Sequence, residues 1–199
     1  MATAKTNLPS GKEMQLDLLR ASREHFLASF AGVSDADCRR KPAEGAWCIL
    51  ETVEHLTMAE SVMLRLITET RRPKSPDLPD REQIFLKVVP DRSRKSRAPE
   101  ASQPTGRFAS LDEAAAQFKT SRERTIQFVE QSIECGEDLR ETEVTHPHPA
   151  VGTVSTHEMV IIMAQHAERH ALQVLELRNT EIKNNLAIHA DATAARSQD

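Results

Sequence analysis

The sequence predicts an all-α protein built as a four-helix bundle. Four long segments carry apolar residues at helical spacing, so each has one face to bury against the others. Each segment opens with a capping-box pattern, in which a small residue is followed three positions later by Glu. Glycine occurs only six times, whereas the helix-favouring residues Ala, Leu, Glu, Arg and Gln are abundant.

The composition indicates one domain and gives no sign of a nucleic-acid or membrane partner. A chain of 199 residues can bury a core without disulfides or a structural metal. Its net charge is −4, so we expect no overall attraction to nucleic acid or membrane. The N-terminus has no apolar signal core, and no segment approaches membrane-spanning length. Cys38, Cys48 and Cys135 lack a paired framework, which predicts reduced thiols in a cytoplasmic protein.

The first helix is predicted to begin at Ser10, with Glu13 completing its capping box, and to end near Gly32. Residues 1–9 before it are expected to be flexible. His25 falls on the apolar stripe of this helix. We interpret it as a core or boundary residue.

A polar connection with helix breakers, residues 34–46, leads to the second helix, which is predicted from about Cys48 to Arg71. Cys48 stands at the N-cap position, where a thiol is a weaker cap than a hydroxyl, and Glu51 completes the box. His55, one turn further on, lies on the inward face of this helix.

Residues 73–109 form the longest connection of the chain. Six prolines punctuate it, and only residues 81–89 have the pattern of a short element. Such a length is expected if the second and third helices run parallel, because the chain must then return along the bundle. The run 91–97 is basic, and we interpret it as a solvated loop, with contact to nucleic acid or anionic membrane as the alternative.

The third helix is predicted from Ser110 to Gly136, and the fourth opens with Ser155 and Glu158. After Asn179 the sequence becomes polar and small. The bundle is therefore expected to span residues 10–179, and residues 180–199 are expected to form a frayed, polar C-terminal tail.

Three histidines on two helices form a candidate metal site. His166 and His170 are four residues apart, so their imidazoles share one inward face. By the rise of 1.5 Å per residue, His55 lies about 10 Å inside the second helix and His170 about 12 Å from the end of the fourth. Antiparallel packing would make the three converge. Three neutral imidazoles form an open site suited to Zn²⁺, Ni²⁺, Fe²⁺ or Mn²⁺; the alternative is three unrelated core histidines.

Four further residues are candidates for the surroundings of this site. Glu51 and Gln173 could each accept the free N–H of a ligand histidine and fix its tautomer. Each also has a simpler interpretation, Glu51 as a helix cap and Gln173 as a surface amide. We interpret His146 and His148 as residues of a proline-rich turn, with metal ligation or substrate contact at the rim as the alternative.

Three stretches carry a resemblance to the DinB-like superfamily. They are residues 44–60, EGAWCILETVEHLTMAE; residues 98–129; and residues 146–174, HPHPAVGTVSTHEMVIIMAQHAERHALQV. The likeness spans about residues 10–178, and Cys48 departs mildly from it because Ser is common there. The resemblance implies an up-down-down-up bundle with a metal triad at the two helices that hold the three histidines.

The resemblance also implies a choice of functions. Relatives include thiol transferases that use bacillithiol, glutathione or mycothiol, and others are stress proteins that are often homodimers. The first hypothesis is therefore a metal-dependent thiol S-transferase with a low-molecular-weight thiol, which the basic run 91–97 could steer. The second is a metal-dependent hydrolase, with Glu51 as its only candidate base. The third is a non-catalytic, stress-related bundle that acts through a partner or dimer interface.

Overall fold

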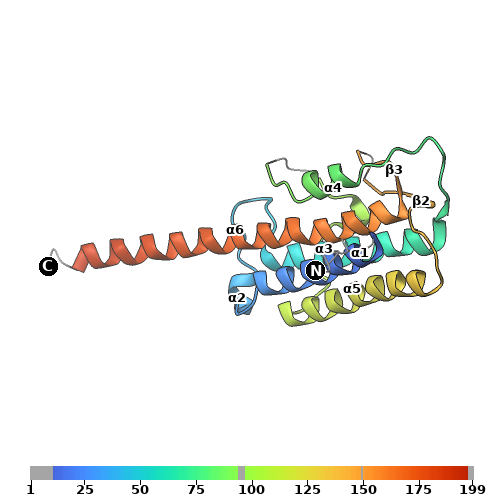
Figure 1. The fold of residues 1–199 in the computed structure, drawn as a ribbon. Helices are drawn as coiled ribbons and strands as arrows, with labels where there is room; N and C mark the ends of the chain where they lie inside the picture. The colour runs from blue at the N-terminus through green and yellow to red at the C-terminus, as the bar shows by residue number, and fades with distance from the viewer. Residues whose placement is uncertain (1–10, 94–96, 149, 197–199) are drawn as a thin grey trace, which may run out of the picture.

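Four long helices pack side by side in the computed structural model, which describes residues 11–93, 97–148 and 150–196 (Figure 1). They are α1 (Gly11–Ser29), α3 (Ile49–Thr70), α5 (Leu111–Glu134) and α6 (Thr156–Arg196). Both α1 and α3 contact α5 and α6. The predicted four-helix bundle is confirmed. No helix among the described residues is long and apolar enough to cross a membrane.

Two clusters of buried apolar side chains, one toward each end of the bundle, show the directions of the helices. One cluster contains Phe26 of α1, Ile49 of α3, Phe118 of α5 and Val174 of α6. The other contains Leu19 of α1, Ile67 of α3, Ile126 of α5 and Met159 of α6. Helices α1 and α6 therefore run one way and α3 and α5 the other, so the chain between α3 and α5 returns along the bundle.

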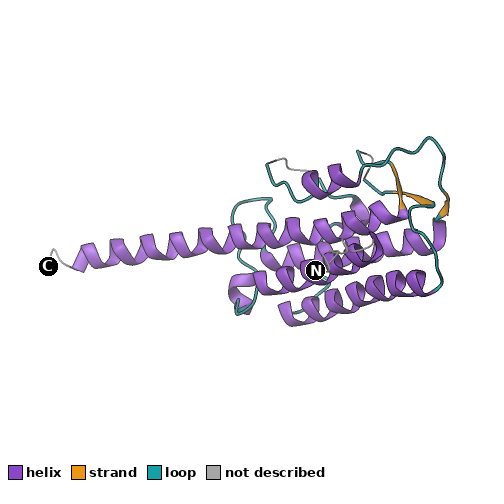
Figure 2. Ribbon diagram, in the orientation of Figure 1, coloured by secondary structure: helices purple, strands orange, loops and turns teal. Residues whose placement is uncertain are grey.

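A small antiparallel sheet beside the start of α6 corrects the prediction of an all-α protein (Figure 2). Its strands are β1 (Arg72–Pro73), β2 (Thr142–Thr145) and β3 (Thr153–Ser155), in the order β1-β2-β3. Val144 stands opposite Val154, and both are buried. The β-branched Thr and Val residues favour extended backbone. The strands are too short for an alternating pattern to stand out in the sequence.

Capping interactions begin three of the helices as predicted. The hydroxyls of Ser110 and Ser155 each accept a hydrogen bond of 3.1 Å from the backbone N–H three residues later. At Cys48 the backbone N–H donates to the carboxylate of Glu51 at 2.9 Å. These contacts satisfy donors that a helix N-terminus otherwise leaves unpaired. Ser10, the predicted cap of the first helix, lies outside the described residues.

Two helical stretches differ from the predictions. The connection 34–46, predicted to be a polar loop, contains a short helix, α2 (Asp35–Cys38). Helix α6 continues to Arg196 and so makes most of the predicted tail helical (Figure 1). The physical reason is composition, because no Pro or Gly follows Gly152 and nothing in the sequence breaks the helix.

The connection between α3 and α5 carries the short helix α4 (Glu82–Val88), which matches the element predicted over residues 81–89, and a single 3-10 turn, Glu100–Ser102. We call residues 73–109 the crossover segment. It is held to α3 by Glu54, whose buried carboxylate accepts hydrogen bonds of 2.7–3.2 Å from the backbone N–H groups of residues 105–107. A carboxylate with three such donors fixes the backbone of the segment against the helix.

A fully buried ion pair joins all four long helices. The guanidinium of Arg122 on α5 donates to both carboxylate oxygens of Glu60 on α3, at 2.7 and 2.9 Å. It also donates to the Leu19 carbonyl and the Ser22 hydroxyl of α1, at 3.0 and 2.7 Å, and to the Met163 carbonyl of α6, at 3.2 Å. Neither charged side chain has any exposed area. The pair is therefore neutralised and almost fully hydrogen-bonded inside the core.

Candidate metal centre

Three histidines meet between α3 and α6. The Nε2 atom of His166 lies 3.4 Å from Nε2 of His55 and 2.9 Å from Nε2 of His170. All three potential ligand atoms lie within 4.8 Å of one another. The antiparallel packing of the two helices brings the histidines to one depth, as the sequence analysis expects.

Hydrogen bonds at the opposite ring nitrogens aim two of the lone pairs toward this meeting point. Nδ1 of His55 donates to the backbone carbonyl of Ser102 at 2.7 Å, and Nδ1 of His170 donates to Oε1 of Gln173 at 2.9 Å. A carbonyl oxygen only accepts, so each neutral ring carries its proton on Nδ1 and its lone pair on Nε2. The tautomers are therefore those that a shared cation requires.

Burial keeps these imidazoles neutral. It lowers the pKa of His55, and it lowers the pKa values of His166 and His170 well below the ordinary value. Burial is the largest cause in each case, because the low-polarity interior disfavours the protonated ring. The histidines also lower one another's pKa through repulsion between charged rings. A neutral ring is the form that ligates a metal.

The distances from the central nitrogen, Nε2 of His166, to the other two nitrogens suit a first-row divalent cation. Bonds of about 2.0–2.1 Å in tetrahedral geometry separate two ligand nitrogens by about 3.4 Å. Two of the three separations, 2.9 and 3.4 Å, lie close to that value, and the third is at most 4.8 Å. Three imidazole ligands leave room for one or more further ligands.

An open cavity of about 1350 Å³ reaches the three histidines. It is large enough for a small organic molecule. Its walls come from the 42–47 loop, α3, the crossover segment, the turn between β2 and β3, and α6. Reactants could therefore approach the histidines from solvent.

His146 and His148 lie in the wall of this cavity. Nδ1 of His146 accepts a hydrogen bond of 3.0 Å from the backbone N–H of His148, so the neutral ring carries its proton on Nε2. Burial, with the nearby charge of His148, lowers the pKa of His146 to about 4. The two residues belong to a turn, as interpreted from the sequence, and that turn forms part of the cavity.

Comparison with known proteins identifies the family. Residues 18–174 match the model of the DinB superfamily, a stretch that includes all three histidines. The chain belongs to the DinB superfamily. The resemblance seen in the sequence is thereby confirmed.

Two individual proteins illustrate the DinB relationship. The uncharacterized protein YuaE of Bacillus subtilis is 26% identical over 147 residues, which cover 74% of this chain and 86% of YuaE. The solved structure of YfiT from Bacillus subtilis, a probable metal-dependent hydrolase with an unusual four-helix bundle topology, superposes with a TM-score of 0.55 at 12% identity. That superposition covers 89% of this chain and 92% of YfiT, and it shows a shared fold.

In this DinB bundle Glu51 acts as a helix-cap residue, the simpler of the two roles considered for it. Its carboxylate accepts the N–H of Cys48 and forms an ion pair of 2.9 Å with Lys41. At His55 the N–H acceptor is the carbonyl of Ser102, so Glu51 does not take the other role considered for it there. Glu51 lies in the first turn of α3, where its side chain reaches back to the helix start.

Gln173, in contrast, lies beside a histidine of the DinB site. Its Oε1 accepts from His170, and it also accepts from Nη1 of Arg92 at 3.2 Å. Arg92 is further fixed by two hydrogen bonds to Glu176, of 2.8 and 2.6 Å. The basic run 91–97 thus includes one residue that supports the histidine cluster; residues 94–96 lie outside the described part of the chain.

Two contributors to the DinB site escape prediction from the residue pattern. Ser102 acts through its backbone carbonyl, so its side chain gives no sign of this role. The ring centroids of Trp47 and His55 lie 4.8 Å apart. Trp47 was part of the family resemblance, but its residue type alone does not predict this contact. His25, weighed in the sequence as a core or boundary residue, is partly exposed and pairs with Glu168 at 2.5 Å.

Proposed function

We propose that this DinB-superfamily protein is a divalent-metal-dependent enzyme whose cation is held by His55, His166 and His170. The observation that carries the proposal is the convergence of three neutral imidazoles, two of them with their Nε2 lone pairs fixed inward, at the wall of an open cavity. A cation held there would supply Lewis acidity and an open position at which a thiol or a water molecule is activated. Zinc and nickel are the first candidates, followed by iron and manganese.

The protein's own groups would orient both the ligands and the substrate. Ser102 and Gln173 hold two of the histidine rings through their Nδ1 protons, and Trp47 packs against the ring of His55. His146 offers an Nε2–H donor in the cavity wall, suited to a substrate oxygen that gains negative charge.

Two reactions are compatible with this site. Thiol S-transfer from a low-molecular-weight thiol is the first, and it draws support from the thiol transferases that the sequence resembles. Hydrolysis is the second, and the shared fold with YfiT, a probable metal-dependent hydrolase, supports it. Glu51 is engaged at the helix start, which removes the general base that the sequence suggested for hydrolysis. The thiol reaction needs no such base when the thiol ionises on binding the metal.

Elemental analysis of the untagged, full-length protein tests the proposal. About one equivalent of a divalent transition metal per chain is expected, either as purified or after reconstitution with Zn²⁺, Ni²⁺, Fe²⁺ or Mn²⁺. Absence of stoichiometric metal under all of these conditions would contradict the proposal and favour a non-catalytic bundle that acts through a partner. With metal bound, turnover of an electrophile only when a thiol is added would distinguish S-transfer from hydrolysis.

Replacing Arg92 by Gln is expected to weaken zinc binding about 10-fold, the lower end of the effect of removing outer-shell support. The reason is that Arg92 holds Gln173, and Gln173 in turn orients His170. Competition with a chelator of known affinity measures the change. Arg71→Gln is the matched control, since Arg71 makes a similar two-bond pair with Glu137 away from the cavity. Equal zinc affinity in the two variants would show that Arg92 does not support metal binding.

A further inference from the structure

The cavity continues beyond the histidines along an apolar path. Ala59 lies one turn after His55 on α3, and Ile162 lies one turn before His166 on α6. Because the two helices run in opposite directions, both steps lead toward the end of the bundle that carries the sheet. Both apolar residues line the same cavity as the histidines.

Helix α4 adds an exposed apolar wall to this path. Ile84 and Val88 are 53% and 55% exposed, and they lie four residues apart on one face of the helix. Among the described residues, the only other exposed large hydrophobic side chain is Leu172, at 39%. Ile84 and Val88 line the cavity, whereas Leu172 does not. Phe85, between them in sequence, is buried in the core and anchors the helix. We call Ile84 and Val88 the α4 wall.

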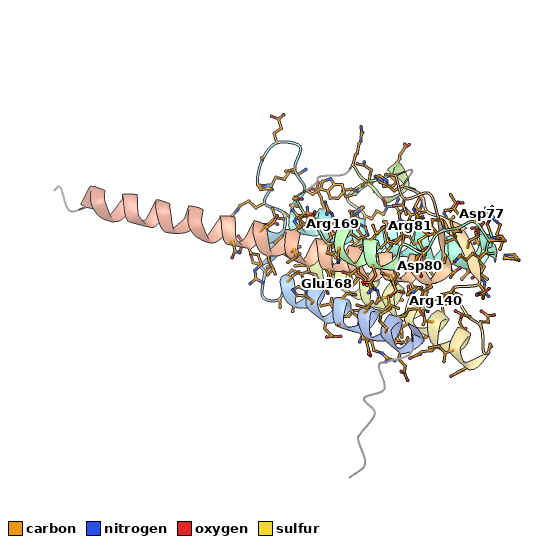
Figure 3. The ribbon with its side chains drawn as sticks, turned by 45° about the horizontal axis from the view of Figure 1, so that its top comes forward. Asp77, Asp80, Arg81, Arg140, Glu168 and Arg169 are labelled. Atoms are coloured by element: carbon orange, nitrogen blue, oxygen red, sulfur yellow. The ribbon has the colours of Figure 1, made fainter. Side chains whose placement is uncertain are left out.

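The α4 wall is fixed at both ends. Arg81, at the start of α4, donates to the carbonyl of Val151 in the turn before β3 at 3.0 Å. Arg169 of α6 donates to the carbonyls of Val89 and Asp91, just past the end of α4. Figure 3 shows Arg81 and Arg169 on either side of α4. An apolar face held in this way is preorganised for a ligand.

On the side of the histidines away from the α4 wall, the cavity wall includes polar residues. Gln173, Glu176 and Arg92 line the cavity there, and Arg92 donates hydrogen bonds to both of the others. The histidine cluster therefore lies between an apolar region and a polar one. A molecule whose reacting group sits at the histidines would meet apolar surface in one direction and hydrogen-bonding groups in the other.

We propose that the α4 wall binds an aliphatic or aryl group of the substrate, attached to the group that reacts at the histidines. This inference rests on the proposed metal-dependent function. The continuity of the α4 wall with the cavity favours a small molecule over a second copy of the chain, because the apolar surface leads inward to the histidines.

A chain-length series of metal-binding probes tests the proposal. The full-length, zinc-loaded protein is titrated calorimetrically with straight-chain hydroxamic acids, from acetohydroxamic to octanohydroxamic acid. The hydroxamate group chelates the metal in every member, so the series varies only the apolar chain. We expect the affinity to rise about three- to fourfold for each methylene that reaches the α4 wall.

Two variants localise the effect. In Ile84→Ser combined with Val88→Ser, we expect octanohydroxamic acid to lose at least about tenfold in affinity, while acetohydroxamic acid binds as to the native protein. Leu172→Ser is the matched control, because it removes an exposed apolar side chain outside the cavity. An equal chain-length dependence in native protein and double variant overturns the proposal. If that equality is accompanied by loss of a dimer in sedimentation, the wall binds a second copy instead.

Failure of the metal site gives a different result. Acetohydroxamic acid would then not bind even to the native protein. The α4 wall is in that case tested without metal, by the fluorescence of the neutral dye N-phenyl-1-naphthylamine, which rises in apolar surroundings. Dye binding that is lost in the double variant and kept in Leu172→Ser supports an apolar site. Equal dye binding in all three proteins overturns it.

Discussion

Replacing His166 by Ala is expected to reduce metal affinity by well over 100-fold and to leave a folded protein without stoichiometric metal. His166 is the central member of the cluster, since its Nε2 lies near the Nε2 atoms of both His55 and His170. Loss of outer-shell partners alone costs about 10–100-fold in metal affinity, and loss of a direct ligand costs more. Elemental analysis after dialysis against a trace of zinc measures the effect.

The control for this variant is His148→Ala. His148 lines the same cavity but is not one of the three converging histidines. Its removal should leave the metal content unchanged. Circular dichroism of both variants should retain the helical spectrum of the native protein, because the two apolar clusters that fill the bundle are untouched. Full metal retention in His166→Ala would exclude the proposed site.

Replacing Glu60 by Gln is expected to lower the free energy of unfolding by about 3–5 kcal/mol, the usual cost of breaking a buried ion pair from one side. The substitution leaves the guanidinium of Arg122 charged in a fully buried position with no carboxylate beside it. Urea denaturation followed by circular dichroism measures the change.

Two comparisons separate this cost from a general effect of losing a charge. Glu137→Gln removes the carboxylate from a surface pair with Arg71, and its expected cost is about 0–1 kcal/mol. The double variant Glu60→Leu with Arg122→Met removes both charges and should recover much of the loss. A Glu60→Gln protein as stable as Glu137→Gln would show that the buried pair contributes nothing beyond a surface one.

The residues that could be predicted are those whose roles follow from helical periodicity. The i and i+4 spacing of His166 and His170, with the depth of His55, predicts that the three converge if their helices pack antiparallel. The helices and their caps followed from the same local rules, as Ser110 and Ser155 show. These features depend on neighbours within a few positions of the chain.

The features that escaped prediction depend on contacts between distant parts of the chain. From the sequence, Glu60 looks like an ordinary polar residue of a helix. Its buried role depends on Arg122, which lies 62 positions away in the chain. Arg92 is one of several cations in a basic run, and nothing local distinguishes the one that turns inward. The strands β2 and β3 are stabilised by pairing with each other, so short segments with little pattern still form a sheet.

The crossover segment couples the chemistry of the site to the local stability of a connection. It supplies the Ser102 carbonyl for His55 and the Arg92 side chain behind His170, and Glu54 holds its far end to α3. If the segment opens, two histidines lose their orienting partners together. Binding of the proposed cation and closure of the segment would then be thermodynamically linked, each stabilising the other by the same free energy. Surface connections normally tolerate insertions well. In this bundle an insertion in the crossover segment would displace groups that orient the histidines.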